Sequence, residues 1–65
     1  MNTPWQSNPI AVDGFELRIS TADGRVNLGR ISDGIYASDF LLTPDQTRRL
    51  ARALLEGADK AEAQS

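Results

Sequence analysis

The dipeptide Asp-Gly recurs at ten-residue intervals, and this spacing constrains the fold more than any other feature of the chain. The three copies are Asp13-Gly14, Asp23-Gly24 and Asp33-Gly34. Both residues tolerate positive φ, which the tight two-residue hairpin turn requires, so Asp-Gly between alternating apolar segments is a strong hairpin signal. An interval of ten residues accommodates one strand of ordinary length and its turn. The repeat therefore predicts an antiparallel meander of three or four strands.

The segments between the turns carry the alternation expected of half-buried strands. Apolar Phe15, Leu17 and Ile19 alternate with polar neighbours in the first full segment. Val26 and Leu28 continue the alternation in the next one. Residues 35–42 are expected to form the last strand, and residues 10–12 a short first strand at the sheet edge.

The alternation breaks after Gly29. Arg30 stands where an apolar residue is due, and Ile31 takes the opposite phase. A β-bulge at Gly29 would shift the register by one residue and return Ile31 to the core face, so we expect a bulge there.

A helix start follows the last strand. Thr43 is placed at the N-cap, Pro44 at the first helical position and Gln46 at N3, the pattern of a capping box, while Asp45 suits the positive helix end. Gly57 costs about 1 kcal/mol in a helix interior, so the helix is expected to fray or end there. Apolar residues recur on one face at helical spacing, at Leu50, Ala51, Leu54, Ala58 and Ala61.

These elements predict one small α+β domain over residues 10–65. Its fold is an antiparallel three- to four-stranded β-meander packed on one face by a C-terminal α-helix, preceded by an irregular N-terminal arm over residues 1–9 with Trp5 as an anchor. One helix covers only one face of a sheet. The other face is expected to remain open, and it carries Glu16, Arg18, Asn27 and either Tyr36 or Ser38.

The composition argues against catalysis. The 65 residues include no cysteine and no histidine, so disulfides, the preferred zinc ligands and the imidazole base of Ser-His-Asp or Cys-His sites are all missing. Each Asp-Gly aspartate has a sufficient role as a turn former. We therefore expect no enzyme activity, no catalytic residue, no cofactor and no metal site.

A protein partner is the expected ligand. Acidic side chains in the strands and turns could steer association with a basic surface, although polar turns are also ordinary surface. The candidate partner-binding residues are Glu16, Asp23, Asp33, Tyr36 and Asp39. Homodimerisation through the open face or an edge strand is the other option, which leaves monomer and homodimer open.

Nucleic-acid binding is the lesser alternative. Arg48, Arg49 and Arg52 cluster in the helix and could contact phosphates. A net charge of −2 argues against it, because dedicated nucleic-acid domains are usually basic. The first residues, 1–6, show no basic segment followed by an apolar run, and no stretch approaches the roughly 18 apolar residues of a membrane span. We expect a cytoplasmic protein that does not enter membranes.

A resemblance suggests a class of partner. The run Leu42-Thr43-Pro44-Asp45-Gln46, followed by Leu50-Ala51 and Leu54-Leu55, resembles the C-terminal end of many small proteins of phages and their bacterial hosts. The whole chain is similar in character to phage-encoded anti-CRISPR inhibitors. That resemblance implies binding to a Cas subunit and blocking of a Cas effector complex in the host-cell cytoplasm, and we expect the blocking to use the acidic surface. The alternative is a host accessory or regulatory domain, antitoxin-like or a homodimeric assembly partner.

Overall fold

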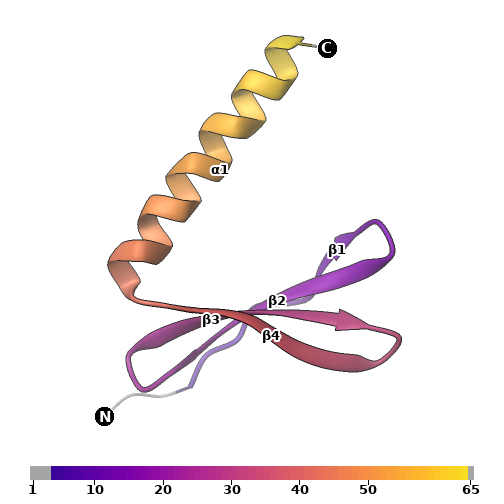
Figure 1. Ribbon diagram of the computed structural model, residues 1–65, viewed down its shortest axis with the longest axis vertical. Coiled ribbons are helices and arrows are strands. Elements are labelled where there is room, and N and C mark those ends of the chain that lie inside the picture. The colour runs from indigo at the N-terminus through magenta and orange to yellow at the C-terminus, as the bar shows by residue number, and fades with distance from the viewer. Residues whose placement is uncertain (1–3, 65) are drawn as a thin grey trace.

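A computed structural model describes residues 4–64 and contains a four-stranded antiparallel sheet followed by one helix (Figure 1). The strands follow one another across the sheet in chain order, which confirms the α+β class and the meander. The first three residues of the expected arm over 1–9 lie outside the described part. The elements are β1 (Ile10–Val12), β2 (Phe15–Ala22), β3 (Arg25–Ser32), β4 (Ile35–Leu42) and α1 (Pro44–Gln64).

Two of the three Asp-Gly turns have the type I′ backbone that their sequence predicts. Asp23 and Gly24 have φ values of 52° and 72°, and Asp33 and Gly34 have 52° and 75°. Positive φ at both central residues is the mark of the type I′ hairpin turn. At the first turn only Gly14 is positive, at 86°, so that turn belongs to a different type.

The pairing register divides the strand residues between two faces, because paired residues lie on the same side of a sheet. We call the side that meets α1 the helix-side face and the opposite side the far face. The helix-side face carries Ile10, Val12, Phe15, Leu17, Ile19, Thr21, Val26, Leu28, Arg30, Ile35, Ala37, Phe40 and Leu42. The far face carries Ala11, Glu16, Arg18, Ser20, Asn27, Gly29, Ile31, Tyr36, Ser38 and Leu41.

The predicted bulge lies at Gly29 only in the pairing of β3 with β4. Leu28 pairs with Phe40 and Gly29 with Ser38, so the extra residue is Asp39 on β4. The register of β2 with β3 runs through Gly29 without a shift. The expectation that the bulge returns Ile31 to the core face is therefore wrong. Ile31 lies on the far face, and Arg30 takes the helix-side position.

The N-terminal arm continues the sheet along the edge of β2. The Ser7 amide donates to the Ile19 carbonyl at 2.7 Å, and the Thr21 amide donates to the Trp5 carbonyl at 2.8 Å. Trp5 is thus held by its backbone, while the residue stays 56% exposed. With β1 on the same edge, the arm satisfies backbone groups of β2 that an open edge would leave unpaired.

The start of α1 confirms the capping box. The Thr43 amide donates to Gln46 Oε1 at 2.9 Å, and the Gln46 amide donates to Thr43 Oγ1 at 3.1 Å. Asp45 also pairs with Arg49 across one turn at 2.7 Å. The expectation that the helix frays or ends at Gly57 is wrong, because α1 continues to Gln64. Its good helix formers on both sides of Gly57 outweigh the cost of one glycine.

The helix packs on the sheet only through its first turns. Figure 1 shows α1 leaving the end of β4 and diverging from the strands, so that its C-terminal half lies away from the sheet. Among the described residues no apolar side chain is buried, and Gly29 is the one buried residue. The fold is complete in its backbone pairing but lacks a filled core.

Candidate protein-binding surface

The contact between α1 and the sheet is a small apolar groove. The helix side of this groove is formed by Thr47, Leu50, Ala51 and Leu54. Between them and the sheet a gap of about 110 Å³ remains, and its walls are entirely apolar. The sheet side of this groove is formed by Ile19, Val26, Leu28 and Leu42.

The rest of the helix-side face lies outside the groove beneath α1. We call Phe15, Leu17, Ile35, Ala37 and Phe40 the open apolar half. Phe40 is 57% exposed and Ile35 is 71% exposed. Neither lies in the groove beneath α1. The helix that the sequence places over this face therefore leaves half of it in contact with water.

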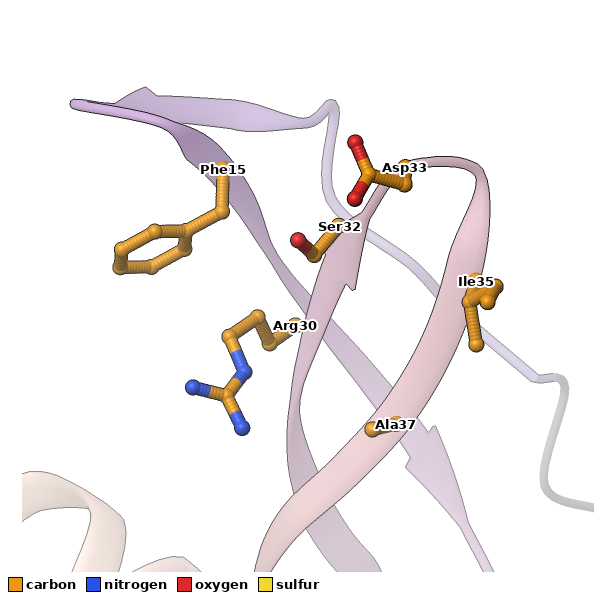
Figure 2. Close-up of a pocket in the computed structure, with 6 residues that line it drawn as sticks. All are labelled: Phe15, Arg30, Ser32, Asp33, Ile35 and Ala37. Atoms are coloured by element: carbon orange, nitrogen blue, oxygen red, sulfur yellow. The ribbon is translucent and has the colours of Figure 1, made fainter.

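A shallow depression of about 390 Å³ lies in the open apolar half, near the turn between β3 and β4. Figure 2 shows the Phe15 ring and the Arg30 side chain projecting to the same side from neighbouring strands. Arg30 forms an ion pair with Asp39 at 3.5 Å, which gives the charged group a partner on this apolar face. The depression therefore has one apolar flank and one charged flank.

The total exposed surface is large for a chain of this length. A compact folded chain of this size is expected to expose roughly 4,100 Å². This one exposes 5391 Å². The excess of roughly 1,300 Å² is more than the ~800 Å² that each partner buries in a standard protein–protein interface. The missing burial is thus of the size that a partner protein supplies.

The far face is organised by Tyr36, whose ring lies over Gly29. A side chain on Gly29 would collide with that ring, so only glycine fits beneath it. The Tyr36 hydroxyl accepts a hydrogen bond from the Asn27 amide group, and Asn27 in turn accepts one from Ser38. This polar network occupies the middle of the far face and satisfies its own members.

A second hollow of about 440 Å³ lies beside this network and includes Arg18 and Gln6. The Nε of Arg18 is buried and makes no hydrogen bond. Ser20, Ile31, Gly34 and Tyr36 complete the walls. The hollow is open and mixed in polarity, and a single half-buried guanidinium does not make it an anion site.

The five predicted partner-binding residues do not form one cluster. Asp23 and Asp33 occupy turns at opposite ends of the sheet. Glu16 and Tyr36 share a row of the far face, since both flank Ile31. Asp39 is the bulge residue and is paired with Arg30. The structure does not gather them into one acidic surface.

The helix arginines are all exposed. Arg49 is bonded to Asp45, whereas Arg48 and Arg52 lie one turn apart along the helix. Sequence reasoning missed the open apolar half. The signal was available in the adjacent apolar run Phe40-Leu41-Leu42, where both faces of one strand are apolar although a single helix can cover only one.

The described residues contain no cluster of three or more acidic, histidine or cysteine side chains able to hold a metal. Over the same part of the chain, no helix has both the length and the apolar character needed to cross a bilayer. No protein family, curated protein or solved structure matches the chain. The candidate site therefore rests on its own geometry.

Proposed function

We propose that this chain is a non-enzymatic protein-binding module whose contact surface is the open apolar half. The observation that carries the proposal is the absence of any buried apolar side chain among residues 4–64, together with the exposure of Ile35 and Phe40 in the open apolar half. A contiguous exposed apolar patch is typical of interaction sites. A partner seated on the helix-side face would complete the core.

The placement of the acidic side chains favours an apolar contact surface over an acidic one. The aspartates at the turns lie far apart in the sheet, and the Asp39 carboxylate already has Arg30 as a partner. Charged groups at the rim of an interface influence association rate, whereas buried apolar and aromatic anchors supply most of the binding energy. Phe15 and Phe40 are the aromatic anchors that we propose.

Neighbouring residues on β4 allow a matched test. Phe40 and Leu41 are adjacent and almost equally exposed, at 57% and 60%, but lie on opposite faces. A photoreactive amino acid is introduced at position 40 or at position 41, and adducts formed in cells are identified by mass spectrometry. We expect protein adducts from position 40, their loss on Phe15→Asp, and few adducts from position 41. Equal adducts at both positions, or none at position 40, would overturn the proposal.

The partner that we propose is a Cas effector complex, and the resemblance to anti-CRISPR inhibitors supports this choice. The protein is expressed in strains with active CRISPR interference, and phage plaques are counted. Inhibition is expected to disappear with Phe40→Asp and to persist with Leu41→Asp. It is also expected to persist when Glu16→Lys and Asp23→Lys are combined, because neither residue lies in the open apolar half. Its loss in that variant would favour an acidic contact.

Unchanged immunity across the common CRISPR types would count against the inhibitor hypothesis. If position 40 still formed adducts in that case, the module would be a host accessory or regulatory domain. The crosslinked protein would then identify its partner.

A further inference from the structure

One side of α1 carries a charge pattern that is complementary to itself. Arg48, Arg52, Leu55, Asp59 and Glu62 follow one another at intervals of four, three, four and three residues. This spacing places them in one line along the helix surface. All five are exposed, and Leu55 is 69% exposed. The line reads basic, basic, leucine, acidic, acidic.

This line is separate from the groove on the sheet. The groove uses Thr47, Leu50, Ala51 and Leu54, and of these only Ala51 also borders the line. At 100° per residue, Leu55 lies roughly 100° around the helix from Leu54. The line therefore points to the flank of α1, next to the small residues Ala51 and Ala58. A second helix could approach there without displacing the sheet.

Within one chain the pattern is unfavourable. Arg48 and Arg52 are like charges four residues apart, which destabilises an isolated helix. The basic residues precede the acidic ones, opposite to the preference of the helix dipole, and the last turn has no basic residue. The arrangement is thus not explained by the stability of the helix alone.

An antiparallel second copy removes these costs. When two α1 helices pair about a two-fold axis at Leu55, Arg48 faces Glu62 of the second copy, because each lies seven residues from Leu55. Arg52 then lies beside Asp59 of the second copy, and Ala51 lies beside Ala58. A two-fold interface must be self-complementary in this way. A parallel pair would instead place like charges together.

We propose that the protein forms a homodimer through antiparallel pairing of α1, with Leu55 at the two-fold axis and Arg48 and Arg52 facing Asp59 and Glu62 of the second copy. Leucine supplies the apolar contact and the small alanines allow the helices to approach closely. The pairing uses a different surface from the open apolar half, so the dimer presents two such halves to partners. The inference does not depend on the proposed function.

Charge exchange between two variants tests the pairing. One variant combines Arg48→Glu with Arg52→Glu, and the other combines Asp59→Arg with Glu62→Arg. Self-association is measured by sedimentation equilibrium at low salt. The unmodified chain is expected to dimerise, and each variant alone to associate at least ~10-fold more weakly, because attractive pairs become repulsive. An equimolar mixture is expected to restore a heterodimer. Added salt is expected to weaken the unmodified dimer.

A control variant changes the net charge by the same amount, at residues of α1 that lie outside the line. Arg49→Glu combined with Lys60→Glu is expected to leave dimerisation within ~3-fold of the unmodified chain at high salt, where the general effect of net charge is screened. The inference would be overturned if the unmodified chain were monomeric at all concentrations, or if the mixture of the two variants stayed monomeric. It would also be overturned if the control variant dissociated as much as the variant with Arg48→Glu and Arg52→Glu. Photo-crosslinking from position 40 is a separate measurement. If the chain does not dimerise, the crosslinking result still tests the proposed function.

Discussion

The contact between Gly29 and Tyr36 predicts that adding a single methyl group destabilises the protein. In Gly29→Ala the new Cβ would occupy the space of the Tyr36 ring. The ring must leave the sheet or the strands must separate. We expect the ring to move, because it lies at the surface and Tyr36 is 47% exposed.

The magnitude follows from the surface that the ring covers. An aromatic side chain buries about 200 Å² when fully enclosed, and Tyr36 buries roughly half of that. Loss of ~100 Å² costs ~2.5 kcal/mol, and the lost hydrogen bond to Asn27 costs ~1 kcal/mol. Replacing a strand glycine restores ~0.5–1 kcal/mol through lower backbone entropy in the unfolded chain. The net expected loss of unfolding free energy is about 2.5–3 kcal/mol.

A double-mutant cycle isolates this contact. Unfolding free energies are measured by urea titration at one fixed chain concentration, with the fluorescence of Trp5 and circular dichroism as readouts. In a Tyr36→Ala background, Gly29→Ala is expected to be neutral or stabilising, since nothing then blocks the methyl group. Gly57→Ala is the control: its Cβ meets open space, and it is expected to stabilise α1 by ~1 kcal/mol. The reasoning is refuted if Gly29→Ala destabilises equally in both backgrounds.

Three further substitutions have expected outcomes in the same unfolding assay. Thr43→Ala removes the N-cap acceptor of the Gln46 amide and is expected to cost about 1 kcal/mol, whereas Thr43→Ser should cost far less. Gly34→Ala is expected to cost ~1–2 kcal/mol, because Gly34 has a φ of 75° that an alanine adopts with strain; an unchanged stability would contradict the type I′ turn. Arg30→Leu removes a partly exposed ion pair but extends the apolar face, so the unfolding free energy is expected to change by less than ~1 kcal/mol; a larger loss would show that the pair with Asp39 supports the bulge.

Local sequence patterns predicted the elements well because each depends on residues close in the chain. The Asp-Gly repeat gave the turns, and the capping box of Thr43 and Gln46 gave the helix start with its hydrogen bonds. The error at Gly29 arose because a bulge involves two strands. The sequence indicated an irregularity there, but only the pairing shows that the extra residue is Asp39.

The candidate surface was harder to predict because it depends on where α1 points. Apolar spacing predicted which helix residues meet the sheet, and Leu50 and Leu54 do meet it. It could not predict the angle at which α1 leaves β4, and this angle leaves Phe40 exposed and Phe15 only half-buried. The acidic candidates failed to form one surface for a similar reason: residues ten apart in a meander alternate between opposite ends of the sheet.

The measurement that tests the account most directly is hydroxyl-radical footprinting of the helix-side face in two settings. The purified chain at high dilution and the same chain in cell lysate are oxidised, and modification of each side chain is quantified by mass spectrometry. We predict that Phe15 and Phe40 are modified in the dilute chain and protected several-fold in lysate, while Leu41 on the far face is modified equally in both. Equal modification of Phe40 in both settings would contradict the claim that another protein covers the open apolar half.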